Sequence, residues 1–286
     1  MLAENKMNRQ NLKLFIEKFK PFYEQVKSDK ECLQFVTKKY RHSMQVLQIG
    51  EEIAKRDNLL QQESVEFLSL GEKALLFHDV GRFAEAGKMF EENMFANHDS
   101  WFSKKYDHGV MSYEMMKNEA GFDDVRILAA LKHHGHMMEK FYEDEEFAFV
   151  KDAEIKREMT AILKWVRDAD KLANFYIQKY EDNLKKDPFF VTMSEQVKNA
   201  PLSEVALAQF DAGKVILTST ITSYCDRLLC CLSWIFDLNY KASYMICAEQ
   251  GYFEMLSAVL AEYNHNEELQ KHIADRIRHE LSARTA

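Results

Sequence analysis

Apolar residues recur three and four positions apart along almost the whole chain, which is the spacing of one face of an α-helix. The sequence has only 9 Gly and 3 Pro among 286 residues, so helix-breaking positions are few. We therefore predict an all-α fold, with helices over residues 8–28, 31–56, 64–79, 104–119, 123–135, 153–181, 203–212, 215–237, 240–261 and 264–284.

Two segments do not follow this helical spacing. Residues 81–103 have no clear period and predict a long loop with helical pieces, a kind of segment that is often functional. Residues 183–202 contain two of the three prolines and predict the joint between a core and a C-terminal extension. We expect a single all-helical unit over 1–286, with a core over 30–182 and a helical extension over 203–286 packed on it.

Residues that can bind metal ions interrupt the apolar faces of five predicted helices. They are His42, the pair His78 and Asp79, His108, the pair His133 and His134, and Asp170. In its helix Asp170 continues an apolar stripe and is expected to point inward. Asp168 lies about 200° from Val166 round the same helix and is expected to point elsewhere.

Buried carboxylates surrounded by imidazoles need a source of positive charge, because an unpaired buried carboxylate costs several kcal/mol. A divalent cation supplies that charge, and mixed imidazole and carboxylate ligands suit Mn, Fe, Co, Ni or Zn better than Ca or Mg. Seven ligands are too many for one tetrahedral ion and suit two octahedral ions. The alternative is that each histidine is a hydrogen-bonded core residue and each aspartate pairs with Arg or Lys. Five such helices in one chain favour the metal site.

The ordered set also resembles a known family, the HD superfamily of metal-dependent phosphohydrolases, and the segments FHDVGRF, DHG and DADKL look closest to a bacterial group of it. The resemblance covers about residues 35–180. It implies that His42, His78, Asp79 and Asp170 form a first metal site and that Asp79 bridges to a second. It further implies that the second ion is held by His108, His133 and His134.

This resemblance implies hydrolysis of a phosphoester or phosphoanhydride in a nucleotide or small phosphorylated metabolite, through a metal-activated hydroxide. Donors to the phosphoryl oxygens are expected near the metal ligands, with Arg82 the first choice. The other candidates are Lys132, Lys171, Lys88, Lys104 and Lys105. For each of them, a solvated surface charge is the competing interpretation.

Departures from the family pattern narrow the range of activities that the resemblance implies. GHMMEKF follows the two adjacent histidines where HHExxDGxGYP would be expected, which disfavours a cyclic-di-GMP phosphodiesterase. Residues 169–173 read ADKLA where relatives often read ADKLD. Ala173 therefore stands where relatives have an aspartate that could support the metal ligands. We interpret His98 and Asp99 as surface loop residues, not as a second metal-binding pair.

Two other functions stay open from the sequence. One is an HD-type diiron oxygenase that uses the same ligands to activate dioxygen. The other is a non-catalytic module that senses a nucleotide and transmits its state through the C-terminal helices. The complete ligand set favours hydrolysis over the sensor.

Composition and charge limit the partners. The net charge of −8 argues against nucleic acid, and the five cysteines, odd in number and in mostly apolar surroundings, predict reduced core thiols. The polar N-terminus and the lack of a long apolar stretch predict a cytoplasmic protein without a membrane partner. The apolar C-terminal helices are expected to cover the core, with a homodimer as the alternative.

Overall fold

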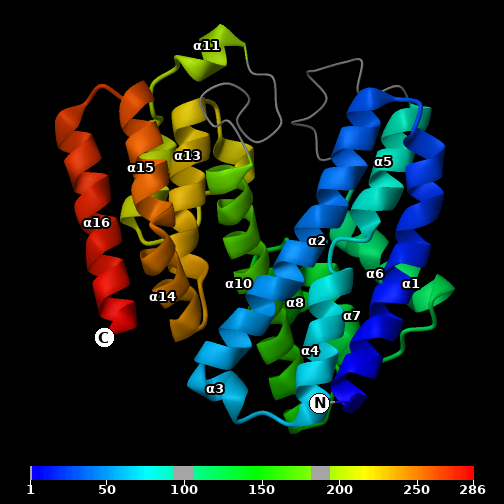
Figure 1. The fold of residues 1–286 in the computed structure, drawn as a ribbon. Coiled ribbons are helices and arrows are strands. Elements are labelled where there is room, and N and C mark those ends of the chain that lie inside the picture. The colour runs from blue at the N-terminus through cyan, green and yellow to red at the C-terminus, as the bar shows by residue number, and fades with distance from the viewer. Residues whose placement is uncertain (1, 93–105, 182–193) are drawn as a thin grey trace. The chain divides into compact units, whose positions relative to one another are not determined.

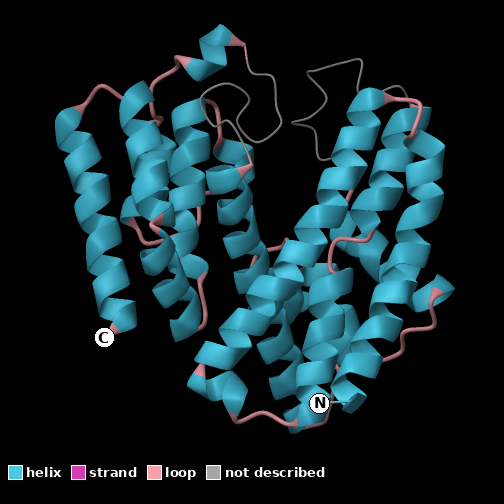
Figure 2. Ribbon diagram, viewed as in Figure 1, coloured by secondary structure: helices cyan, strands magenta, loops and turns pink. Residues whose placement is uncertain are grey.

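The computed structural model describes residues 2–92, 106–181 and 194–286, and all regular elements in these ranges are helical (Figures 1 and 2). The prediction of an all-α fold is therefore confirmed. The chain divides into two compact units, residues 1–170 and 171–286. His98, Asp99, Lys104, Lys105 and most of the predicted joint lie outside the described residues.

The first unit contains every predicted metal ligand. Its helices are α1 (Leu2–Val26), α2 (Lys30–Arg56), α3 (Asn58–Gln61), α4 (Val65–Phe77), α5 (Gly81–Glu91), α6 (His108–Glu119), α7 (Val125–His133), α8 (Met138–Glu143), α9 (Glu145–Ala148) and α10 (Ala153–Tyr180). The part of α10 after Asp170 belongs to the second unit. α2 packs against α1, α4 and α5, while α6 packs against α5 and α7 (Figure 1).

Side-chain caps set where the helices that carry the polar cluster begin. Asp29 accepts a hydrogen bond from the backbone NH of Cys32 at the start of α2, and Ser64 accepts one from that of Phe67 at the start of α4. These caps satisfy donors that the first turn of a helix leaves without partners. Val65, the first residue of α4, is 74% exposed.

The second unit is also helical. It contains α11 (Glu195–Lys198), α12 (Glu204–Asp211), the 3₁₀ turn η4 (Thr218–Thr220), α13 (Tyr224–Ser233), the 3₁₀ turn η5 (Trp234–Asp237), α14 (Lys241–Gln250), α15 (Tyr252–Tyr263) and α16 (Glu267–Thr285). Its core includes Phe175 from the end of α10, whose ring lies 5.3 Å from that of Trp234 and 5.3 Å from that of Phe253.

Two predicted helices of this unit are interrupted. The helix expected over 240–261 is two helices, because Gly251 adopts the left-handed conformation with φ of 60°. The helix expected over 215–237 begins only at Tyr224, where Ser223 caps α13, and it gives way to η5 after Ser233.

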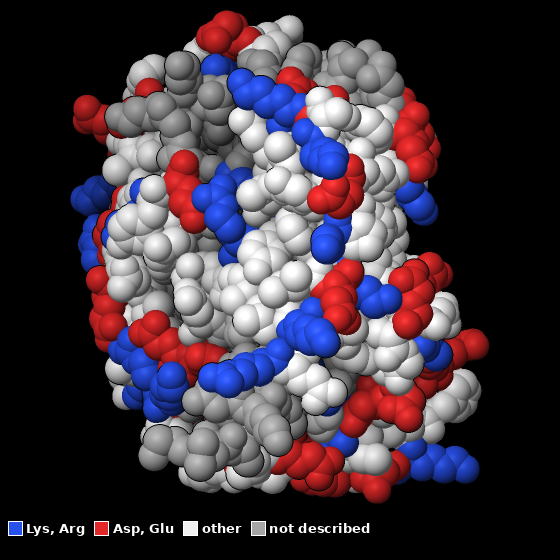
Figure 3. Space-filling view, turned by 45° about the vertical axis from the view of Figure 1, so that its right-hand side comes forward, with Lys and Arg blue, Asp and Glu red and all other residues white. Residues whose placement is uncertain are grey.

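The cysteines are buried, and charged side chains of both signs lie on the surface. All five cysteines are buried free thiols, as predicted. On the face shown in Figure 3, Lys and Arg side chains lie among Asp and Glu side chains. Among the helices of the described ranges, none combines the length and the apolarity needed to cross a bilayer.

Candidate metal centre

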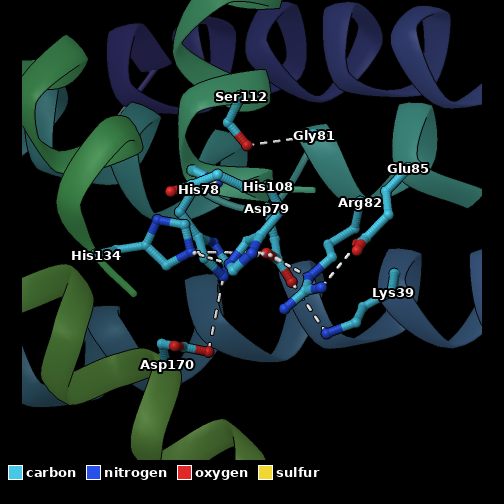
Figure 4. A network of polar contacts seen from close by, with 12 residues as sticks. Lys39, His78, Asp79, Gly81, Arg82, Glu85, His108, Ser112, His134 and Asp170 are labelled. Atoms are coloured by element: carbon cyan, nitrogen blue, oxygen red, sulfur yellow. Dashed lines mark hydrogen bonds and ion pairs between the residues drawn. The ribbon is translucent and has the colours of Figure 1, made fainter. Parts of the chain in front are cut away.

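The His-Asp pair lies in the short connection between two helices. α4 ends at Phe77, and α5 begins at Gly81, whose backbone NH donates a 2.9 Å hydrogen bond to the Ser112 hydroxyl of α6. A Cβ atom on residue 81 would lie 2.2 Å from the carbonyl oxygen of His108. Glycine at this position therefore lets the start of α6, with His108 as its first residue, approach the pair (Figure 4).

A first group of ligand atoms comes from α2 and the His-Asp pair. Suitable atoms of His42, His78 and Asp79 lie within 4.8 Å of one another, and all three residues are buried. Asp170 of α10 adjoins them, since its Oδ1 accepts a 2.9 Å hydrogen bond from His42 Nε2 and lies 3.8 Å from His78 Nε2. We call these four residues the first group.

A second group shares Asp79 and adds the ends of two more helices. His108 Nε2 and His134 Nε2 lie 3.5 and 3.6 Å from Asp79 Oδ1 and 3.1 Å from each other. Ligand atoms of these three residues lie within 4.8 Å of one another. We call Asp79, His108 and His134 the second group.

Two of the histidines are fixed by their own helices. His78 Nδ1 donates to the carbonyl oxygen of Leu75 at 2.8 Å, and His134 Nδ1 donates to that of Leu131 at 2.9 Å. Each Nδ1 therefore carries a proton, and each Nε2 faces the cluster. This is the second-sphere arrangement that orients histidine ligands in metal sites.

The cluster leaves polar atoms that a cation would satisfy. Among the described residues, Asp79 Oδ1 and His78 Nε2 are buried and have no hydrogen-bond partner. Buried polar atoms without partners are rare and costly, and each needs an explanation. A divalent cation accepts lone pairs from carboxylate oxygen and imidazole nitrogen, so these residues fit such an ion.

Two cationic side chains approach Asp79 from one side (Figure 4). Lys39 Nζ lies 3.2 Å from Asp79 Oδ2, and Arg82 Nε lies 3.6 Å from Asp79 Oδ1. Arg82 also donates a 2.7 Å hydrogen bond to Glu85. Burial alone would raise the pKa of Asp79, but Lys39 and the neighbouring imidazoles hold that pKa well below its usual range. Asp79 is therefore ionised at neutral pH.

Burial keeps two histidines of the cluster neutral. It lowers the pKa of His78 to about 4, and it lowers the pKa of His108 well below the usual value, helped by the charge of Arg82. The carboxylates nearby oppose this shift but do not outweigh burial. Neutral imidazole is the form that binds metal ions.

The structure does not bring His133 to the cluster, which corrects its prediction as a ligand. His133 Nε2 donates a 2.9 Å hydrogen bond to Asp144, and burial lowers its pKa to about 4. The physical reason is that neighbouring residues of a helix point about 100° apart, so His133 and His134 face different partners.

The predicted lysine donors also lie elsewhere. Lys132 pairs with Asp144 at 2.6 Å, and Lys171 pairs with Asp237 of the second unit at 2.8 Å. Both were chosen for being next to a ligand in sequence, and the same 100° rotation turns them away. Lys88 is exposed on α5. Of the predicted phosphoryl donors in the described ranges, only Arg82 lies within ion-pair distance of Asp79.

The sequence did not identify Lys39 as part of the site, and the expected orientation of Asp168 was wrong. Lys39 lies one turn before His42 on α2, and that spacing was the signal that could have found it. Asp168 is 0% exposed, whereas the side chain of Asp170 is 23% exposed. Buried residues occur on every side of α10 near these positions, so one apolar stripe does not describe that part of the helix.

Comparison with known proteins agrees with this geometry. Residues 40–174 match the family described as the HD domain. HD domains are typically metal-dependent hydrolases that bind divalent cations. No curated protein and no solved structure matches the chain significantly.

Proposed function

We propose that the protein is a metal-dependent phosphohydrolase that cleaves a phosphoester or phosphoanhydride of a nucleotide or small phosphorylated metabolite. The first group would hold one divalent cation and the second group another, with Asp79 shared between them. Mn, Fe, Co, Ni and Zn are the candidates, because the ligands combine imidazole with carboxylate.

One observation carries the proposal. The imidazoles of His42, His78, His108 and His134 converge on two carboxylates, Asp79 and Asp170. Asp79 Oδ1 and His78 Nε2 are left without hydrogen-bond partners at the centre of that arrangement. The family is typically hydrolytic, so this cluster is the place where such chemistry would occur.

Divalent cations bound there would supply a Lewis acid and lower the pKa of water near a phosphoryl group. Lys39 and Arg82 have side chains that are 22% and 26% exposed while they contact Asp79. An anionic group arriving from solvent would therefore meet two cationic donors beside the shared carboxylate. The Nδ1 hydrogen bonds of His78 and His134 would hold the imidazoles in place during the reaction.

The experiment measures bound metal and hydrolysis together. Protein prepared without chelator or nickel resin is analysed for metals. Separate samples are loaded with Mn²⁺, Fe²⁺, Co²⁺, Ni²⁺ or Zn²⁺ and assayed on a panel of nucleotides, pyrophosphate and sugar phosphates. Asp79→Asn removes the shared carboxylate charge and keeps its shape. Asp211→Asn is the matched control, because Asp211 also pairs with a histidine, His272 at 2.7 Å, but lies in the second unit.

We expect about two equivalents of metal in the parent and in Asp211→Asn, and phosphate release by both. We expect Asp79→Asn to lose metal and activity while remaining folded. A folded parent that takes up none of the five candidate metals would contradict the proposal. Assays without oxygen distinguish hydrolysis, which continues, from an oxygenase, which stops.

A further inference from the structure

The segment that follows α7 is held by a polar network separate from the ligands. His136 Nε2 donates a 2.7 Å hydrogen bond to Asp107 Oδ2, and its Nδ1 lies 3.3 Å from His133 Nδ1. The carbonyl oxygens of His134 and His136 both accept hydrogen bonds from Arg167 Nη1 of α10, the first at 3.0 Å. A ligand residue, His134, thus lies in a segment fixed from α6 and from α10.

Asp107 connects the same network to the other histidine of the second group. It is the N-cap of α6, and its Oδ1 accepts hydrogen bonds from the backbone NH groups of Gly109 and Val110 at 3.1 and 3.2 Å. His108 is the first residue of that helix.

Close packing leaves little freedom between the two helices. A Cβ atom on Gly109 would lie 2.5 Å from the carbonyl oxygen of Lys132, so the first turn of α6 lies directly against the last turn of α7. The hydrogen bond between His136 and Asp107 also joins the start of α6 to the segment after α7. By contrast, His42 of the first group comes from α2, and its hydrogen bond to Asp170 does not involve Asp107, His136 or Arg167.

We infer that Asp107, His136 and Arg167 are positioning residues that set the separation of His108 and His134, and so control binding of the second cation without control of the first. This inference rests on the proposed function, since it assigns a role within the same metal centre. Loss of second-sphere hydrogen bonds typically lowers metal affinity about 10- to 100-fold. We expect a loss of that size for the second cation only.

The test uses His136→Phe, which removes both ring hydrogen bonds, and His136→Gln, whose amide can still donate to Asp107. The matched control is His272→Phe, which breaks another His-Asp pair of 2.7 Å in the second unit. Binding of Mn²⁺ is measured by equilibrium dialysis with elemental analysis. Electron paramagnetic resonance distinguishes a coupled Mn²⁺ pair from an isolated ion.

For His136→Phe we expect one tightly bound Mn²⁺, a second bound about 10- to 100-fold more weakly, and loss of the coupled-pair signal. His136→Gln and His272→Phe should keep both ions and the coupled signal. If His136→Phe does not fold by circular dichroism, Asp107→Ser provides the same test, because serine keeps the helix cap but cannot reach His136.

Three results would overturn the inference. In the first, His136→Phe or Asp107→Ser binds both ions as tightly as the parent does, or loses affinity for both ions equally. This result would rule out a selective role of the network and leave the proposed function intact. A parent that binds only one Mn²⁺ has no second site to position. A parent that binds no Mn²⁺ overturns the inference, and one that binds none of the five candidate metals contradicts the proposed function as well.

Discussion

Arg167 and Asp170 lie one turn apart on α10 and contact opposite parts of the same cluster. Asp170 Oδ1 accepts the hydrogen bond from His42, and Arg167 donates to the backbone carbonyl of His134. A single turn of α10 therefore contacts the side chain of a first-group residue, His42, and the backbone of a second-group residue, His134. The orientation of α10 about its own axis affects both groups.

Replacement of Arg167 by methionine should destabilise the protein by about 2 to 3 kcal/mol, because two carbonyl groups lose a charged donor. Arg167 is only 4% exposed, so water cannot fully replace it. Urea denaturation monitored by circular dichroism measures the change. Arg278→Met is the control: its side chain is 71% exposed, and its loss should change stability by less than about 0.5 kcal/mol. Equal effects of the two variants would show that the Arg167 hydrogen bonds contribute nothing specific.

Lys39→Met should destabilise the metal-free protein by about 1 to 3 kcal/mol, because it removes a positive charge from a buried carboxylate. Bound Mn²⁺ replaces that charge, so the loss should be smaller in the loaded protein. Thermal melting with Mn²⁺ and with a chelator makes the comparison, and Lys39→Arg should retain most of the stability. An identical loss in both conditions would contradict this account.

The same variant has a predictable pH dependence. The folded-state pKa of Asp79 is depressed, so its stabilising effect is present above the unfolded value near 4 and is lost as the pH falls below it. The stability difference between parent and Lys39→Met should therefore be constant near neutrality and shrink below about pH 4. Urea midpoints measured at pH 7 and at about pH 3.5 test the sign.

Gly81→Ala should cost about 1 to 3 kcal/mol and weaken the second group, because the new Cβ would overlap the backbone of α6 at His108 and Ser112. Gly87→Ala on the same helix is the control, since its Cβ would lie 2.6 Å from Oε1 of Gln25, the end of a flexible side chain that can move aside. Melting temperature and Mn²⁺ stoichiometry are the measurements. A Gly81→Ala protein that melts and binds like the parent would show that α6 can move away without consequence.

The cysteines should resist alkylation in the folded protein. Burial raises the pKa of Cys32 and Cys231 to about 12 and that of Cys225 to about 11, from a usual value of 9.0. Iodoacetamide at pH 8 should modify all five thiols only after denaturation, as measured by mass spectrometry. Because the folded state holds these protons more tightly, stability should also fall as the pH rises above about 9. Rapid modification of the native protein would contradict the buried positions.

The sequence predicted the parts of the site that depend on one residue and its own helix. His42 was found because it shares the face of Val46, Ile49 and Ile53, and all four are buried in α2. The choice between His133 and His134 could not be made in this way. It depends on which partner each ring meets, and Asp144, the partner of His133, is on a different element.

The same limit explains other differences. The spacing of Lys39 and His42 places both on one face of α2, but the contact of Lys39 with Asp79 joins α2 to the connection that follows α4, and a helical period does not reveal that partner. Gly251 was visible in the sequence, but a glycine inside an apolar stretch does not by itself reveal that its φ is positive. The spacing of apolar residues thus located the helices. The points where helices are interrupted, and the partners of the polar side chains, became clear only from the tertiary structure.

The backbone hydrogen bonds of His78 and His134 have a thermodynamic consequence. Each ring donates Nδ1–H to the carbonyl three residues earlier, so both side chains are already restricted to one rotamer in the folded chain. Their conformational entropy is lost when the protein folds and not when a ligand arrives. Preorganisation of this kind favours tight binding at the expense of the stability of the empty protein, which makes cation concentration a determinant of how much of the chain is folded.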